Sequence, residues 1–140
     1  MFNPSRDDAR KFFFESWRKF QAKEILTPLE DMTAQLIGKH PEYHTILEDP
    51  AGYQNHDYQP EQGDTNPFLH LMMHLTIEEQ ISIDQPTGVR HHFTRLAQKF
   101  GSEHDAHHQI MDCLGEMMWQ AQRNKRQPDP AIYLDCLEKQ

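Results

Sequence analysis

A side chain that can cap a helix is followed directly by proline at several places in this sequence. Four such pairs are Asn3-Pro4, Thr27-Pro28, Asn66-Pro67 and Asp129-Pro130. At an N-cap, the side-chain oxygen accepts a hydrogen bond from a backbone N–H of the first turn, and proline at the next position has no N–H to leave unsatisfied. Each pair therefore predicts the start of a helix.

Hydrophobic spacing predicts how far these helices run and where others begin. We expect helices from Pro4 to about Ala22, from Pro28 to near Gly38, from Pro67 to about Ile83, from Val89 to Phe100, from Ser102 to about Asn124 and from Pro130 to about Leu137, with a short helical stretch over residues 43–47. No segment alternates with the period of two that marks a half-buried strand. The sequence therefore predicts an all-α fold, a single-domain bundle of five to seven helices over residues 1–140.

The segment 50–65 follows neither period and contains glycine, proline, asparagine, aspartate and three ring side chains. We expect a loop, which at about 16 residues is longer than most connections. Such a loop either covers a functional site or is an ordered surface loop.

Charge and composition exclude several classes of partner. The chain has 22 acidic and 14 basic residues and a formal charge of −8, which disfavours nucleic acid and anionic membranes. It has no apolar run of membrane-spanning length, and its charged N-terminal segment lacks the apolar core of a signal peptide. The two cysteines, Cys113 and Cys136, are too few for a disulfide framework and lack the spacing of a thiolate zinc site. We therefore expect a cytoplasmic protein in a reducing setting.

Four of the histidines form two pairs with identical spacing, His70 with His74 and His104 with His108. Residues four apart lie on one face of a helix. Neutral imidazole is a common ligand of transition metals. Each pair is therefore a candidate half of a metal site.

A carboxylate follows each pair after four more residues, Glu78 on the first helix and Asp112 on the second. One short helix connects the two helices, so we expect them to pack in parallel, with His70 near His104, His74 near His108 and the two carboxylates together. This matched register predicts a shared site for zinc, iron or nickel.

Three further residues are candidates to surround that site: Glu79, Glu116 and His107. His107 falls inside an apolar helix face, where a histidine is more often a core residue bonded to a carboxylate or carbonyl. Glu79 lies opposite the histidine face, as a buried acid that needs a partner such as Arg90 or Arg123. The alternative to metal binding is a buried network of histidines and carboxylates. Of the remaining five histidines, His91 and His92 flank the apolar stripe of a short helix, and His40, His44 and His56 show no pattern.

Several motifs are spread along the chain: Met1-Phe2-Asn3-Pro4-Ser5-Arg6, Asn66-Pro67-Phe68-Leu69-His70 with His74, Glu78-Glu79-Gln80, Ile83-Asp84-Gln85-Pro86, and Cys113-Leu114-Gly115-Glu116-Met117 followed by Trp119-Gln120-Ala121-Gln122-Arg123. With them the chain resembles a family of small uncharacterised bacterial proteins, a domain of unknown function. The resemblance implies a bacterial cytoplasmic protein and brings no activity, cofactor or partner. More loosely, histidine pairs on helices are similar to those of damage-inducible helical metalloproteins. Di-iron bundles match less well, because a repeated Glu-x-x-His motif is missing.

Three classes of function remain, and the sequence does not decide whether the protein is an enzyme. The first is a metal-binding bundle, in which a glutamate beside the site could act as a base. The second is a non-enzymatic module that binds a protein partner or a second copy of itself through exposed aromatics such as Phe12, Phe14 or Trp119. A metal-free hydrolase ranks last, because no serine or cysteine nucleophile stands in a recognised motif.

Overall fold

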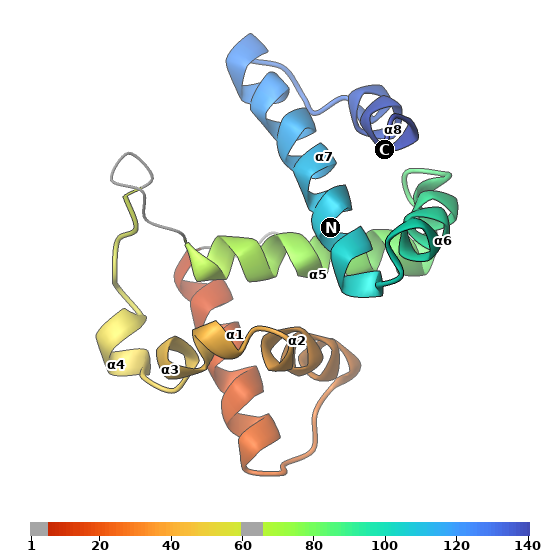
Figure 1. Ribbon diagram of the computed structural model, residues 1–140. Coiled ribbons are helices and arrows are strands. Elements are labelled where there is room, and N and C mark those ends of the chain that lie inside the picture. The colour runs from red at the N-terminus through yellow and green to blue at the C-terminus, as the bar shows by residue number, and fades with distance from the viewer. Residues whose placement is uncertain (1–5, 60–65) are drawn as a thin grey trace. The chain divides into compact units, whose positions relative to one another are not determined.

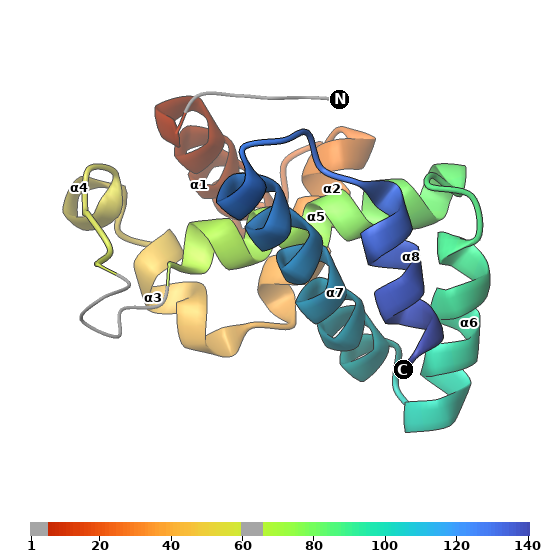
Figure 2. The same cartoon turned by 90° about the horizontal axis from the view of Figure 1, so that it is seen from above.

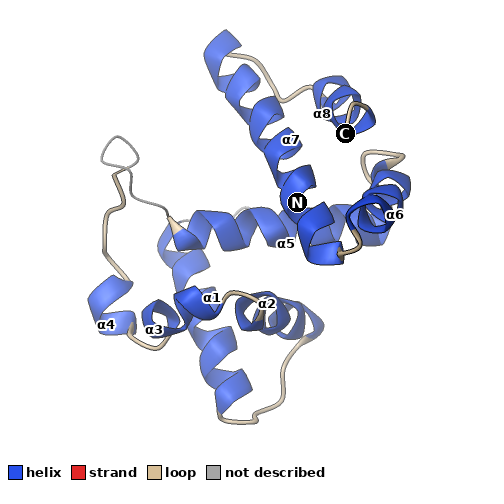
Figure 3. Ribbon diagram, viewed as in Figure 1, coloured by secondary structure: helices blue, strands red, loops and turns tan. Residues whose placement is uncertain are grey.

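The computed structural model describes residues 6–59 and 66–140, so the helix start predicted at Asn3-Pro4 lies outside the described residues. The described residues form helices and turns, and no strand occurs among them (Figure 3). The prediction of an all-α fold is therefore confirmed. Among these residues, no helix combines the length and the apolar character that crossing a membrane requires.

The chain divides into two compact units, Met1–Leu75 and Thr76–Gln140. The single domain over residues 1–140 stays a prediction. The elements of the first unit are α1 (Arg6–Gln21), α2 (Pro28–Gly38), the 3₁₀ helix η1 (Pro41–Tyr43), α3 (His44–Leu47), α4 (Pro50–Tyr53) and the first half of α5 (Pro67–Ile83) (Figure 1). The second unit contains the rest of α5, α6 (Val89–Phe100), α7 (Glu103–Asn124) and α8 (Pro130–Glu138).

The predicted caps at the starts of α2, α5 and α8 are present. Thr27 forms a capping box with Glu30, in which each side chain accepts a hydrogen bond from the other residue's backbone N–H. The Asn66 carboxamide oxygen accepts from the N–H groups of Phe68 and Leu69. Asp129 accepts from the N–H of Ala131. Local side-chain chemistry thus determines where these helices begin.

The described residues contain eight α-helices, one more than the upper limit we predict. The additional helix is α4, a single turn of four residues, whereas α3, also a single turn, corresponds to the short helical stretch expected over residues 43–47. Helix α4 corrects the prediction of a loop over residues 50–65. Its cap is Asp49, whose carboxylate accepts from the N–H of Gly52 at 3.1 Å. Asp49-Pro50 is thus the same signal as the four pairs above.

The core of the first unit is formed by α1, α2 and the start of α5 around a group of aromatic rings. Its buried apolar residues are Phe13, Phe14, Trp17, Leu36, Ile37, Leu47, Phe68, Leu71 and Leu75. The Phe14 and Phe68 rings meet edge to face with centroids 5.5 Å apart. This packing joins α5 to α1 and determines which face of α5 points into the unit.

In the second unit, α8 lies alongside α6 and α7 (Figure 2). Helix α6 is bounded by Gly88 and Gly101, which both adopt the left-handed conformation that glycine allows without steric cost. Tyr133 and Leu137 of α8 are fully buried, and the Tyr133 hydroxyl donates a hydrogen bond to the Gln80 side chain at 2.7 Å.

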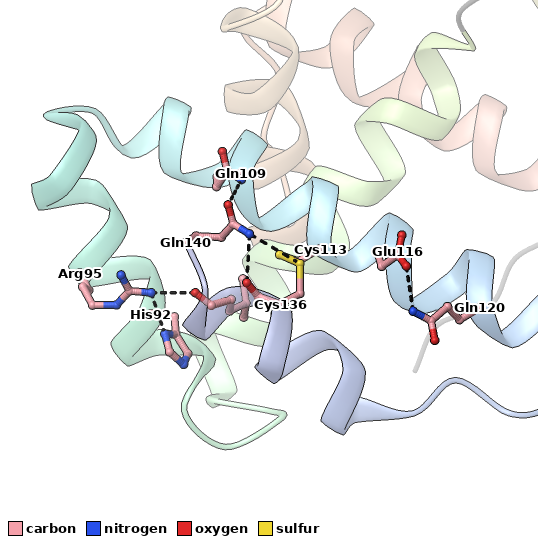
Figure 4. Close-up of a disulfide and its surroundings, with 9 residues drawn as sticks. His92, Arg95, Gln109, Cys113, Glu116, Gln120, Cys136 and Gln140 are labelled. Carbon is pink, nitrogen blue, oxygen red and sulfur yellow. Dashed lines mark hydrogen bonds between the residues drawn. A yellow bond between two sulfur atoms is a disulfide. The ribbon is translucent and has the colours of Figure 1, made fainter.

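A disulfide between Cys113 and Cys136 joins α7 to α8 (Figure 4). This pairing differs from the reduced cysteines expected from the sequence. The two residues are 23 apart in the chain, and the turn between the two helices brings them together. Tertiary packing, rather than a cysteine motif, therefore forms this bond.

Candidate metal centre

Three histidine rings converge in the first unit. His70 and His74 lie one turn apart on α5, and His40 follows α2 as the N-cap residue of η1. The Nε2 atom of His70 lies 3.3 Å from Nε2 of His40 and 3.1 Å from Nε2 of His74. One ring nitrogen from each of the three lies within 4.8 Å of the others. The cluster therefore turns three nitrogens toward one point.

The main chain of α2 orients His40. Its Nδ1 lies 2.7 Å from the carbonyl oxygen of Leu36, near the end of that helix. A carbonyl oxygen only accepts hydrogen bonds, so Nδ1 must carry the hydrogen and donate it. In the neutral ring, Nε2 then carries a lone pair, and this lone pair faces His70. Such a hydrogen bond to the other ring nitrogen is typical of metal-ligating histidines.

Hydrogen bonds alone do not satisfy both short contacts of His70. If its Nε2 carries a hydrogen, that hydrogen points at only one of the two neighbouring rings. If it carries none, it cannot bond to the neutral His40 ring, whose Nε2 has no hydrogen either. In the neutral state, one of the two contacts therefore lacks a full hydrogen bond.

A cation bound between the rings would contact all three nitrogens at once. Ligand distances of about 2.0–2.1 Å and tetrahedral angles place two ligating nitrogens about 3.3–3.4 Å apart. The two separations from His70 Nε2, 3.1 Å to His74 and 3.3 Å to His40, are close to this value. Two of the three nitrogen pairs therefore already have the spacing that a shared metal ion would require.

The three histidines differ in how far they are buried. His40 and His74 are fully buried, and His70 is half-buried. The Tyr43 ring lies parallel to His40, with centroids 5.4 Å apart, and meets His70 edge to face at 5.9 Å. Burial, with a smaller contribution from Glu42, raises the pKa of Tyr43 above its ordinary value. The phenol therefore stays protonated at neutral pH beside the cluster.

The carboxylates predicted as ligands lie in the second unit. Glu78 is hydrogen-bonded to His107, with Oε1 2.7 Å from Nε2. His107 is buried and meets the Phe93 ring edge to face. Asp112 is exposed. Glu78 thus engages a core histidine, and the roles of Glu78 and Asp112 as metal ligands stay predictions.

The two glutamates predicted beside the site are both exposed. Glu79 is on the surface, and the Arg90 guanidinium instead donates to the carbonyl oxygens of Ile81 and Ser82, near the end of α5. The idea of a buried Glu79 that needs a basic partner is therefore wrong. Glu116 accepts a hydrogen bond from the Gln120 side chain at 2.8 Å on the surface of α7 (Figure 4).

The second histidine pair is present on α7 with the expected local geometry. The His104 and His108 rings meet edge to face with centroids 4.3 Å apart, and both residues are half-buried. Their predicted convergence with His70 and His74 is a relation between the two units and stays a prediction.

His40 is the residue that sequence reasoning missed. It has no partner at helical spacing, because it follows the end of α2 and precedes Pro41. The other two histidines without a pattern have different surroundings. His44 Nε2 lies 2.9 Å from the Ile37 carbonyl oxygen under the Trp17 ring, and His56 is exposed.

The aromatics proposed from the sequence as a partner-binding surface have different environments. Phe14 is buried in the core and Phe12 is half-buried, so Phe14 cannot serve as an exposed anchor. Trp119 is 53% exposed, and the Arg123 guanidinium lies over its ring at 5.2 Å.

A family model described as domain of unknown function (DUF1841) matches residues 5–139. The chain belongs to this family. The resemblance expected from the sequence is thereby confirmed, and the DUF1841 match includes all three histidines of the cluster. Comparisons with curated proteins and with solved structures give no match. For this DUF1841 chain, function must therefore be argued from the site itself.

Proposed function

We propose that this protein binds a divalent transition metal ion through the Nε2 atoms of His40, His70 and His74. The observation that carries the proposal is the pair of short separations between Nε2 atoms, 3.3 and 3.1 Å, which one hydrogen cannot satisfy. The hydrogen bond from His40 to the Leu36 carbonyl supports it, because that bond leaves the His40 lone pair directed at the cluster.

The ligand chemistry favours zinc, with nickel as the next choice. Imidazole suits both ions, whereas non-haem iron sites typically combine two histidines with a carboxylate. No carboxylate belongs to the cluster among the described residues. Iron, which the sequence also allows, is therefore the least favoured of the three.

The remaining coordination position decides whether the centre is structural or catalytic. Structural zinc sites have four protein ligands, whereas catalytic sites have three and a water whose pKa falls to about 7. His104 and His108 are the predicted source of further ligands. With neither of them bound, a water at the open position would make hydrolysis or hydration the chemistry to test.

Metal binding is tested with untagged protein, since an affinity tag of histidines would itself bind zinc. We expect stoichiometric zinc or nickel after purification. After chelation, we expect a rise in unfolding free energy of about 2.7 kcal/mol when zinc is added at a hundredfold excess over the dissociation constant. His70→Ala and His74→Ala should abolish that rise, and His91→Ala, at an exposed position of α6, should leave it unchanged. A rise that survives in both cluster variants would overturn the proposal.

The same assay tests the ligands predicted on α7. His104→Ala and His108→Ala weaken zinc binding only if their side chains reach the metal. A reduced gain in either variant supports the shared site expected from the sequence. An unchanged gain in both variants restricts the centre to the three histidines of the first unit.

The alternative is a non-enzymatic module that binds a protein partner or a second copy, with histidines that only stabilise the fold. The observation that favours it is the contact between the buried His107 and the half-buried Glu78, a histidine-carboxylate interaction of the kind this alternative requires. Under this alternative, His74→Ala lowers stability equally with and without zinc, and purified protein contains no stoichiometric metal.

A further inference from the structure

A cavity of about 190 Å³ lies in the first unit beside α1 and the start of α5. Its apolar lining consists of Ala9, Phe68, Leu69 and Met72, and its polar lining of Arg6, Arg10 and Asn66. None of these residues is one of the three clustered histidines. The cavity is smaller than the roughly 300–1,000 Å³ typical of pockets for drug-sized ligands, so any occupant must be small.

Arg10 is an unusual residue to find in this lining, because it is only 2% exposed. Its Nη1 donates to three main-chain carbonyl oxygens, those of Tyr53 at 3.0 Å, Gln54 at 3.1 Å and His56 at 2.7 Å. The guanidinium also lies over the Phe68 ring at 4.6 Å. All of these partners are formally neutral.

No carboxylate forms an ion pair with Arg10 among the described residues. Asp57 instead pairs with Arg6 at 2.7 Å. The Nε and Nη2 groups of Arg10 have no acceptor in the described part of the protein. Burial, and to a lesser degree the charge of Arg6, lowers the pKa of Arg10 from its ordinary value. The negative charges of Asp57 and Asp7 act in the opposite direction but do not reverse the shift. A buried cation without a carboxylate in direct contact is costly, and an anion in the cavity would offset that cost.

The two unused groups of Arg10 determine which anion fits. Nε and Nη2 lie on the same edge of the guanidinium, and this edge matches the two oxygens of a carboxylate in a bidentate contact. The rest of the lining is mostly apolar, so the remainder of the ligand should be apolar too. Inorganic phosphate would satisfy the charge but leave the apolar wall without contacts.

We propose that this cavity binds a small organic carboxylate with an apolar body. Its carboxylate accepts hydrogen bonds from Nε and Nη2 of Arg10, and its aromatic or aliphatic part packs on Phe68 and Leu69. The site is separate from the proposed metal centre in its residues and in its chemistry.

The test uses the full chain after metal removal by a chelator, so that a carboxylate cannot bind through a metal ion. Benzoate and hexanoate are the probes, and benzyl alcohol and inorganic phosphate are the controls. Binding is followed by two-dimensional NMR or calorimetry. We expect saturable binding of at least one carboxylate, at least tenfold tighter than that of either control.

Two variants connect binding to this cavity. Ala9→Leu fills it without changing a charge, and should weaken carboxylate binding at least tenfold. Ala131→Leu, at an exposed position on α8, should have no effect. Arg10→Lys should also weaken binding, because lysine keeps the charge but loses the bidentate edge. If Arg10→Lys fails to fold, the Ala9→Leu variant still tests whether the carboxylate binds in this cavity.

Three outcomes would overturn the proposal. Neither carboxylate binds, a control compound binds as tightly as the carboxylates, or the Ala9→Leu variant binds carboxylate as tightly as the unmodified chain.

Discussion

His40 and Leu36 are joined by a hydrogen bond of 2.7 Å, from Nδ1 of the imidazole to the carbonyl oxygen near the end of α2. This hydrogen bond orients the His40 ring so that its other nitrogen, Nε2, faces His70. His40 belongs to no helix pattern in the sequence. A second histidine makes a similar contact close by, since His44 Nε2 lies 2.9 Å from the Ile37 carbonyl oxygen. The two residues therefore form a matched pair in which only His40 belongs to the cluster.

We predict that His40→Ala and His44→Ala differ in how they respond to metal. Both variants lose a contact with an α2 carbonyl, so both should be less stable than the unmodified chain. Only His40→Ala should also lose the increase in thermal unfolding temperature on adding zinc. Equal zinc responses in the two variants would remove His40 from the proposed ligand set.

The sequence predicts the helices well because their signals are local. Caps such as Thr27 and Asn66 act within one turn, and the glycine that ends α6 is equally local. The signal at Asp49-Pro50 was also present and starts α4, although it lies in a segment without hydrophobic period. Local side-chain chemistry is therefore sufficient to predict where a helix begins, even a helix of a single turn.

The site is less predictable, because tertiary packing forms it. The spacing of His70 and His74 marks them as candidates, but His40 joins them only through the fold of the first unit. The disulfide depends on packing in the same way, since its cysteines lie on different helices. No periodicity along one helix can reveal a residue that another element contributes.

Core packing of α5 leads to a stability prediction. Leu71 and Ile77 are both fully buried, as expected for a helix that is apolar nearly all round. Replacing either by alanine should lower the free energy of unfolding by about 2–5 kcal/mol. Ile83, which is exposed near the end of the same helix, is the control, and its alanine variant should change stability by less than about 0.5 kcal/mol. Urea denaturation measures all three, and a small effect at both buried positions would contradict the described core.

The disulfide between Cys113 and Cys136 gives a prediction about stability and redox setting. Closing a loop of 23 residues should stabilise the oxidised protein by about 3 kcal/mol. The Cys113→Ser variant should therefore unfold at a lower urea concentration than the oxidised chain. When a dithiol reductant is added, both proteins should unfold at a similar urea concentration.

The same cysteines test the cytoplasmic location that the sequence predicts, because disulfides persist in oxidising compartments. Free thiols are alkylated directly in cells, before extraction, and then counted. Two free thiols per chain would support a cytoplasmic location. The absence of free thiols would contradict it.

Acid should destabilise the start of α2 through Glu30. The backbone N–H of Thr27 donates to its carboxylate at 2.9 Å, and the Lys19 ammonium donates at 2.9 Å. The Thr27 hydrogen bond first, and Lys19 second, lower the pKa of Glu30 below its ordinary value. A lowered folded-state pKa means that its contribution is complete above the unfolded pKa of about 4.3 and disappears as the pH falls through the folded value. Glu30→Gln should be less stable than the unmodified chain at neutral pH, and the difference should shrink below about pH 4. A difference that is constant from pH 7 to pH 3 would show that the charge is not responsible.

Glu78 is the residue for which sequence and structure suggest different roles, and a double-mutant cycle separates them. Its carboxylate lies 2.7 Å from Nε2 of the buried His107. If that contact is its role, Glu78→Ala and His107→Ala each lower stability, and the double variant loses less than the sum of the two, with a coupling of about 0.5–3 kcal/mol. The zinc-dependent gain in stability should then persist in all three variants. If Glu78 were instead a metal ligand, as the spacing from His74 predicts, Glu78→Ala would reduce that gain and His107→Ala would leave it intact. We expect the first pattern, because the hydrogen bond to the buried His107 ring occupies one carboxylate oxygen of Glu78 and restricts how its side chain can turn.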